Sequence, residues 1–143
     1  METTNRLFEN LKGGRTSIGC VVTMSDLVVS ELAGDCGMDF CWIDAEHAPH
    51  TIQDVQRHLI ALRGTGCAGL VRVRACEPML IKPYLDLAPD GIIVPMVNTP
   101  ELAEAAARIL EDWKANPDAA RISESDSVCN EARAKLEQYA ATR

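Results

Sequence analysis

The sequence predicts an α/β fold assembled from parallel βα units. Short apolar runs rich in Val, Ile and Leu alternate with segments of helical hydrophobic spacing over most of the chain. The length of 143 residues suits one domain with a true core. The hydrophobic fraction of 47% and the charged fraction of 24% are ordinary for a globular protein, and they exclude a disordered or collagen-like chain.

The amino-terminal part should contain a helix and then a first βα unit. The helix is expected at residues 5–12, where apolar side chains recur at helical spacing before a Gly-Gly pair. An extended apolar strand follows at residues 17–22. Ser25 or Asp26 can then cap a helix that runs to about residue 36 and ends at a glycine.

The second unit combines a strand at residues 39–44, a polar loop at 45–50 and a helix capped by Thr51. Four apolar side chains at helical spacing give this helix one buried stripe. They are Ile52, Val55, Leu59 and Leu62.

Two further units complete the repeating pattern. A third strand is expected at residues 69–73, and the helix after it begins at Pro78, a residue suited to a first helical turn. Pro83 should kink or restart that helix, because it lacks a main-chain donor. The fourth strand covers residues 91–94, and an alanine-rich helix then occupies residues 99–113.

The pattern changes after residue 113. Residues 114–143 contain no further βα unit, but one more helix is expected at about 126–139. We therefore divide the chain into a βα part, residues 1–113, and a divergent, helical tail, residues 114–143.

Charge and targeting signals narrow the function. The chain has 21 acidic and 14 basic residues, a net charge of −7, and no Lys/Arg-rich run, so we expect no nucleic-acid partner. The first fifteen residues are mixed polar and lack a long apolar stretch. We therefore expect neither a secretory signal nor a membrane span, and a cytoplasmic protein.

The six cysteines form no Cys-x-x-Cys pair, and most lie inside apolar runs. In a reducing compartment this favours small buried hydrophobic side chains over disulfides or metal ligands. They are Cys20, Cys36, Cys41, Cys67, Cys76 and Cys129.

Candidate catalytic residues follow the second strand. In parallel α/β proteins functional groups gather at the carboxyl ends of strands, and here Asp44, Glu46 and His47 stand together. A histidine held by an acid is a plausible general base near neutral pH. The alternative is a solvated polar loop.

Two more charged residues are candidates. Arg72 alternates with valines on the third strand and needs an anion, either a substrate carboxylate or an internal salt bridge to Asp44. Asp86 comes near the end of the next helix, so it should lie on the face opposite the strand-end loops. It either solvates its own turn or serves a site in another subunit.

Four segments together resemble the HpcH/HpaI aldolase family of metal-dependent pyruvate aldolases, which includes 4-hydroxy-2-oxoheptanedioate aldolase. The similarity spans about residues 11–108. It is specific because the I-D-x-E-H-x-P and V-P-M-V-N elements occur in the family's order. The segments are residues 39–49, 70–73, 81–87 and 93–99.

The resemblance implies the first four βα units of a TIM (β/α)₈ barrel, and a carbon–carbon lyase that reversibly cleaves a 4-hydroxy-2-oxo acid to pyruvate and an aldehyde. By it, His47 is catalytic, Arg72 binds the substrate, and Asp44 and Glu46 support them. Asp86 is the acid paired with the histidine, across a subunit boundary, so we expect a homo-oligomer.

The resemblance also implies a divalent metal such as Mg²⁺ or Mn²⁺, whose family ligands come from the second half of the barrel and lie beyond this chain. We expect none of the residues above to ligate it. With two open strand edges, four units form an incomplete barrel. Two alternatives therefore remain: a non-catalytic half-barrel acting as an oligomerisation or interaction module, and a flavodoxin-like module that holds an anion on Arg72.

Overall fold

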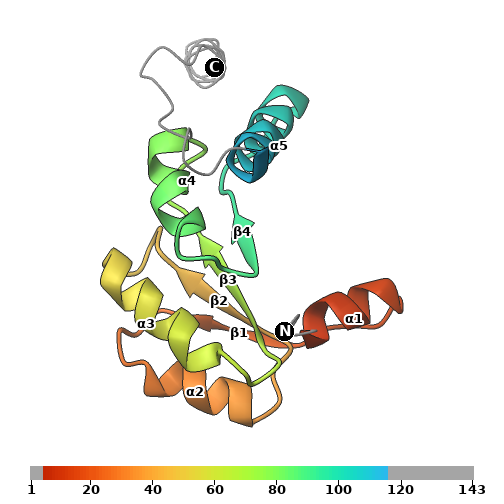
Figure 1. The fold of residues 1–143 in the computed structure, drawn as a ribbon, viewed down its shortest axis with the longest axis vertical. Coiled ribbons are helices and arrows are strands. Elements are labelled where there is room, and N and C mark those ends of the chain that lie inside the picture. Colours follow the sequence, from red (N-terminus) through yellow and green to blue (C-terminus); the bar gives the residue numbers. More distant parts are fainter. Residues whose placement is uncertain (1–4, 116–143) are drawn as a thin grey trace.

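The computed structural model describes residues 5–115, which form one parallel four-stranded sheet with accompanying helices (Figure 1). Neighbouring strands in the sheet follow the chain order β1-β2-β3-β4. The predicted α/β fold with parallel strands is thus confirmed. The strands are β1 (Gly19–Val22), β2 (Phe40–Asp44), β3 (Ala68–Arg72) and β4 (Gly91–Ile93).

Helices precede, separate and follow these strands. Their positions match the predicted pattern to within a few residues, because caps and proline sites mark most of their ends. They are α1 (Arg6–Lys12), α2 (Val28–Asp35), α3 (Ile52–Leu62), α4 (Pro78–Leu85) and α5 (Pro100–Ala115). The helix expected at residues 126–139, and nearly all of the tail, lie outside the part that the structure describes.

Local chemistry explains the helix starts. Thr51 caps α3 through a reciprocal pair of bonds: its hydroxyl accepts from the amide of Asp54 at 3.2 Å, and the Asp54 carboxylate accepts from the Thr51 amide at 2.9 Å. Helix α2 begins at Val28, slightly later than expected, with Leu27 as its N-cap, and the Asp26 carboxylate accepts from the Val28 amide at 3.1 Å.

The expected restart at Pro83 is not observed. Helix α4 continues through Pro83 to Leu85. A proline at this depth removes one main-chain hydrogen bond, and the helix retains its buried side chains Ile81, Tyr84 and Leu85 on the core side. Burial of that face therefore outweighs the single lost bond.

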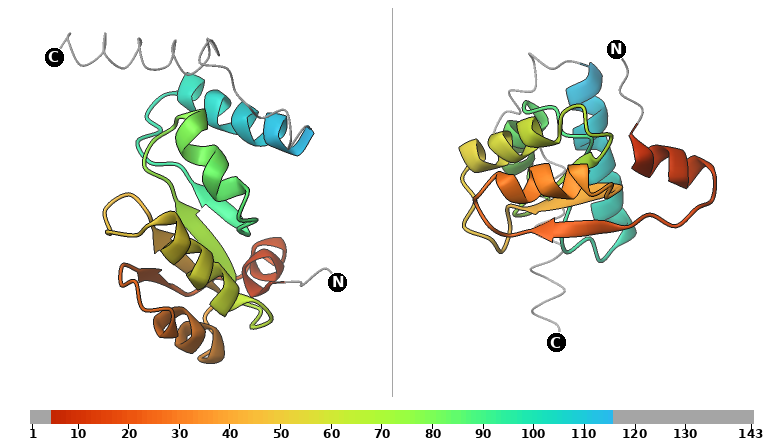
Figure 2. Two further views of the ribbon diagram at one scale, coloured as in Figure 1. Left: turned by 60° about the vertical axis from the view of Figure 1, so that its left-hand side comes forward. Right: turned by 90° about the horizontal axis from the view of Figure 1, so that it is seen from below.

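One face of the sheet carries the hydrophobic core. Helices α2 and α3 contact each other and pack against the strands on that face (Figure 2). Alternate strand residues point into it, and apolar side chains of α3 meet them. The contributors are Val22, Cys41, Ile43 and Val71 of the strands and Val73 directly after β3, all fully buried.

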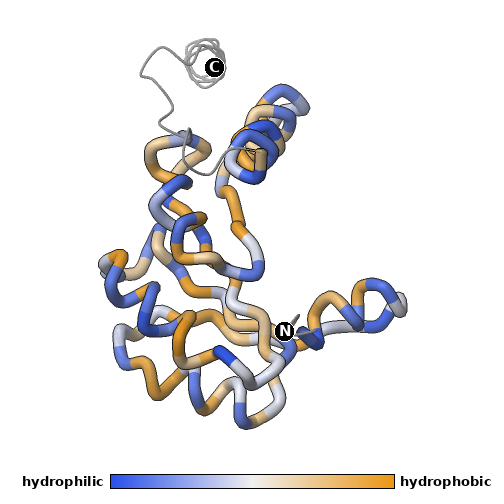
Figure 3. Tube along the Cα trace, in the orientation of Figure 1, coloured by the Kyte–Doolittle hydropathy of each residue, from blue (hydrophilic) through white to orange (hydrophobic). Residues whose placement is uncertain are grey.

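The opposite face, which we name the open face, carries Val21, Phe40, Trp42, Leu70 and Ile93. Register places these residues in rows, because Val21 pairs with Trp42 and Trp42 with Leu70. None of the five is fully buried, and Val21 is 56% exposed. Figure 3 shows the hydrophobic character of β4 beside the mixed hydropathy of α5.

Cysteine burial matches the expectation only in part. Cys41 and Cys67 are buried and Cys20 and Cys76 are partly buried, but Cys36 is exposed at the end of α2, where the helix turns into solvent. Within residues 5–115 no disulfide joins these five cysteines, and Cys129 lies outside the described residues. Within residues 5–115 no helix has the length and apolar character needed to cross a membrane.

Candidate active site

The carboxyl ends of β2 and β3 bring Asp44 and Arg72 side by side. The two residues are register partners in the parallel ladder, so their side chains leave the sheet on the same face. The Arg72 Nε donates to Asp44 Oδ1 at 3.0 Å, and Nη2 donates to Oδ2. Asp44 is 3% exposed, and this bidentate ion pair gives both of its carboxylate oxygens a hydrogen-bond donor.

Two further groups hold the same guanidinium. Its Nη1 lies 3.1 Å from Glu46 Oε2, and its central carbon lies 5.1 Å from the ring centroid of Trp42, a cation–π contact. Trp42 precedes Asp44 by two residues on β2, so it shares the open face with Arg72. The arginine is therefore fixed on three sides, and its side chain keeps 21% exposure.

The electrostatics follow from this geometry. The Arg72 guanidinium lowers the pKa of Asp44 from 3.8 to about 2, against the opposing effect of burial. Backbone amides of His47 and Glu46 donate to Asp44 Oδ1 at 3.1 and 3.0 Å and contribute to this lowered pKa. Asp44 in turn raises the pKa of Arg72 through the same hydrogen bonds. Both groups are charged at neutral pH.

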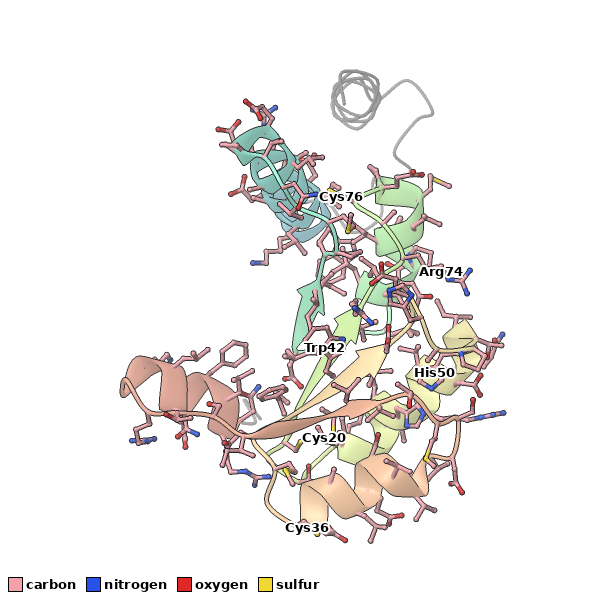
Figure 4. The ribbon with its side chains drawn as sticks, turned by 180° about the vertical axis from the view of Figure 1, so that it is seen from behind. Cys20, Cys36, Trp42, His50, Arg74 and Cys76 are labelled. Carbon is pink, nitrogen blue, oxygen red and sulfur yellow. The ribbon has the colours of Figure 1, made fainter. Side chains whose placement is uncertain are left out.

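Asp44 also shapes the loop that carries His47. Because its carboxylate accepts from the amides two and three residues later, the chain turns sharply after β2. His50, 1% exposed, donates from Nδ1 to the Asp44 carbonyl at 3.0 Å, and Arg74 Nε donates to the Ala45 carbonyl at 3.2 Å. Both bonds therefore hold the start of the turn, and Figure 4 labels the two side chains that make them.

His47 extends from this turn into solvent. Its side chain is 73% exposed, and Nε2 lies 3.6 Å from Glu46 Oε1. Glu46 thus contacts both the imidazole and the guanidinium of Arg72. The structure brings together four of the five predicted site residues: Asp44, Glu46, His47 and Arg72.

Asp86 is the predicted site residue that stays apart. It is the C-cap of α4 and accepts from Lys82 Nζ at 3.0 Å and from Trp113 Nε1 at 3.2 Å. The Lys82 ammonium first, then the indole, lowers its pKa. Among residues 5–115 no hydrogen bond or ion pair joins Asp86 to His47. Nearby Asp90 bonds Gly69 close to the start of β3, at the other end of the strands from Arg72.

Sequence reasoning missed three contributors to the site. Trp42 could have been found, because strand alternation puts it on the face of Asp44. His50 and Arg74 could not, because each acts through a backbone carbonyl whose position depends on the fold of the loop.

The donor set near Arg72 does not fit a divalent cation. Asp44 and Glu46 both spend carboxylate oxygens on the guanidinium, which carries the positive charge there. Among the side chains of residues 5–115, no group of three or more His, Cys, Asp or Glu is arranged to hold a metal ion.

Comparison with known proteins decides the family. The sequence profile of the HpcH/HpaI aldolase/citrate lyase family matches residues 18–130. The chain belongs to this family. The resemblance of the strand-end motifs is thus confirmed.

Individual relatives agree with this assignment. A hydroxypyruvate/pyruvate aldolase of Roseobacter denitrificans is 34% identical over 104 residues, and a 5-keto-4-deoxy-D-glucarate aldolase of Escherichia coli is 36% identical over 102 residues. These matches cover 73% and 71% of the chain.

A solved structure of a family member has a similar fold. An HpcH/HpaI aldolase/citrate lyase family protein from Burkholderia cenocepacia superposes with a TM-score of 0.67 at 31% identity, over 74% of the chain and 42% of that protein. The two aldolases are covered to 41% and 40% of their lengths. The HpcH/HpaI chain therefore spans about two fifths of the relatives that it matches.

Proposed function

We propose that the chain provides the keto-acid-binding part of a carbon–carbon lyase, one that cleaves a 4-hydroxy-2-oxo acid to pyruvate and an aldehyde. The observation that carries this proposal is the Arg72 cluster: a guanidinium clamped by Asp44, Glu46 and Trp42, with His47 beside it. Membership of an aldolase/citrate lyase family supports the reaction class.

Arg72 has donors to spare for a substrate. A guanidinium carries five N–H groups, and its bonds to Asp44 and Glu46 use three of them. The remaining two, one on each terminal nitrogen, suit the carboxylate and the 2-oxo oxygen of a small keto acid. Because the carboxylates fix the arginine beforehand, little ordering is needed when substrate binds.

His47 would move the proton. As general base it takes the proton of the substrate's 4-hydroxyl, the C3–C4 bond breaks, and the aldehyde leaves. The electron pair remains on the three-carbon fragment as an enolate, which becomes pyruvate when its methylene carbon is protonated. Glu46, 3.6 Å from the imidazole, stabilises the histidinium formed in between.

The complete enzyme would need more than the described residues. We propose that four βα units here are part of a (β/α)₈ barrel, that Asp86 reaches His47 of another subunit in a homo-oligomer, and that activity depends on a divalent metal held outside residues 5–115. Exposed positions of both His47 and Asp86 are compatible with a contact between copies.

Pyruvate release tests the proposal. The full chain is incubated with 4-hydroxy-2-oxo acids of different lengths, with Mg²⁺ or Mn²⁺, and pyruvate is measured with lactate dehydrogenase. We expect turnover that is lost in His47→Ala and kept in Arg57→Ala, a change at an exposed arginine of α3. Absence of turnover, or equal rates for His47→Ala and the parent, would count against catalysis by this chain.

A second candidate is a non-catalytic half-barrel that associates with a second copy. Edge strand β1 favours it, because Val21 and neighbouring Ile18 are 56% and 66% exposed. Light scattering separates the two candidates when combined with the assay. A stable dimer without pyruvate release supports the half-barrel, whereas a monomer excludes it.

A further inference from the structure

Three cysteine sulfurs form a row on the helix-covered face of the sheet. Cys20 Sγ lies 3.6 Å from Cys41 Sγ, and Cys67 Sγ lies 3.8 Å from Cys41 Sγ on the other side. Cys20 comes from β1, Cys41 from β2, and Cys67 immediately precedes β3. The lyase chemistry proposed above uses none of these thiols, which belong to the opposite face from Arg72.

We propose that Cys20 and Cys41 form an oxidant-sensitive dithiol, which a peroxide converts to a disulfide that joins β1 to β2. The two residues are register partners on adjacent parallel strands. Strand spacing puts their Cα atoms about 4.8 Å apart, inside the range of about 4.4–6.8 Å that disulfides adopt. Side-chain rotation can therefore close the gap between the sulfurs with little backbone movement.

The pair Cys41 and Cys67 is less suitable although its sulfurs are also close. Cys41 is the register partner of Gly69, two residues beyond Cys67. One strand spacing sideways and two residues along the strand separate the Cα atoms by about 8 Å, which exceeds the distance that a disulfide spans.

The difference in exposure between Cys20 and Cys41 decides which thiol reacts first with the peroxide. Cys20 is partly exposed, whereas Cys41 is fully buried. The thiolate of Cys20 attacks a peroxide, the O–O bond breaks, and a sulfenic acid and one water result. Cys41 then attacks that sulfur, the S–S bond forms, and the hydroxyl leaves with the Cys41 proton as a second water. Two thiols lose two electrons, and one peroxide gains them.

Surrounding groups keep Cys41 in the thiol form until then. Its pKa is raised, first by the hydrogen bond with Cys67 and then by burial. It therefore contributes as the second, resolving thiol of the pair. The alternative role of the three sulfurs is packing alone, which leaves every thiol reduced after peroxide treatment.

Peptide mapping tests the pairing directly. The folded full chain is treated with hydrogen peroxide, denatured, alkylated with N-ethylmaleimide and cleaved before aspartates. This cleavage separates Cys20 in peptide 1–25, Cys36 in 35–38 and Cys41 in 39–43, with Cys67 and Cys76 in 54–85. We expect peptide 1–25 linked to 39–43, with the link lost on reduction.

Cysteine-to-serine variants show which two sulfurs form the disulfide. Cys20→Ser should abolish the linked peptide, and Cys67→Ser should retain it. Cys36→Ser, at an exposed cysteine of α2, is the matched control and should also retain it. Circular dichroism of Cys20→Ser checks that the variant is folded. The peptide map of the parent chain tests the pairing even if this variant does not fold. Complete alkylation of Cys20 and Cys41 after peroxide, or a link from 39–43 to 54–85, would overturn the proposal.

Discussion

Asp44 and Arg72 occupy partner positions on β2 and β3 and share two hydrogen bonds at the carboxyl edge of the sheet. This one pair decides the shape of the site. Asp44 turns the following loop through its other bonds, and Glu46 on that loop contacts both Arg72 and the imidazole of His47. The internal salt bridge and the substrate-binding role of Arg72 are compatible, because the arginine retains unused donors.

Loss of the guanidinium should destabilise the fold. Arg72→Met leaves the Asp44 carboxylate, 3% exposed, without a cation, and we expect the free energy of unfolding to fall by about 2–4 kcal/mol. Urea denaturation measures it. The double variant Asp44→Asn/Arg72→Met should recover much of the loss, and Arg57→Met on α3 serves as the exposed control. Equal denaturation midpoints for Arg72→Met and Arg57→Met would contradict the importance of this pair.

The same pair predicts a loss of stability in acid. Because the pKa of Asp44 is lowered from 3.8 to about 2, the folded chain holds a carboxylate that the unfolded chain protonates more readily. Its contribution, about 2 kcal/mol at neutral pH, is complete well above pH 4 and is lost as the pH falls to about 2. In Asp44→Asn, the free energy of unfolding measured by urea denaturation should depend less on pH between about 4 and 2. An unchanged slope in Asp44→Asn would show that other carboxylates dominate.

A second titration is expected near neutral pH from His58. Burial lowers its pKa below 6.5, and nearby His50 lowers it further, while Asp54 and Asp26 oppose this. The neutral ring lies 2.9 Å from the Ser30 hydroxyl. As the pH falls below about 6.5 the unfolded state takes up a proton before the folded state, so stability declines.

Denaturation at pH 7.5 and pH 5.5 checks the histidine. We expect the parent to lose stability between these values and His58→Gln to lose less of it. Asp44→Asn is a suitable comparison, because Asp44 titrates in a separate acidic window and should leave this difference unchanged. A parent whose denaturation midpoint is the same at both values would refute the prediction.

Sequence patterns predicted most of the fold because its elements follow from local signals. The capping box at Thr51, the proline at the start of α4 and the apolar runs of the strands act over a few residues. The restart considered at Pro83 does not occur, because burial of the α4 core face, a tertiary effect, outweighs the local loss.

The site was predictable to the extent that it depends on strand ends. Parallel strands bring residues such as Asp44 and Arg72 to one edge, so their proximity follows from topology. The burial of His50 beneath the turn depends on the loop path, which no local pattern specifies. Whether Asp86 pairs with His47 of another copy depends on assembly and stays a prediction.

Trp42 should report substrate binding at Arg72. The chain has two tryptophans, and Trp113 donates to Asp86, apart from the Arg72 cluster, so Trp113→Phe leaves Trp42 as the sole indole emitter. Its ring lies 5.1 Å from the guanidinium carbon. A keto-acid analogue such as oxalate, bound by the free donors of Arg72, should change the polarity around the ring and hence its emission. In Trp113→Phe we therefore expect a saturable fluorescence change on titration with oxalate.

The additional substitution Arg72→Lys should weaken binding at least tenfold, because an ammonium cannot keep the bidentate bond to Asp44 and still face the ligand. Arg57→Lys should leave the titration unchanged. Equal affinities in the Arg72→Lys and Arg57→Lys backgrounds would place the anion elsewhere.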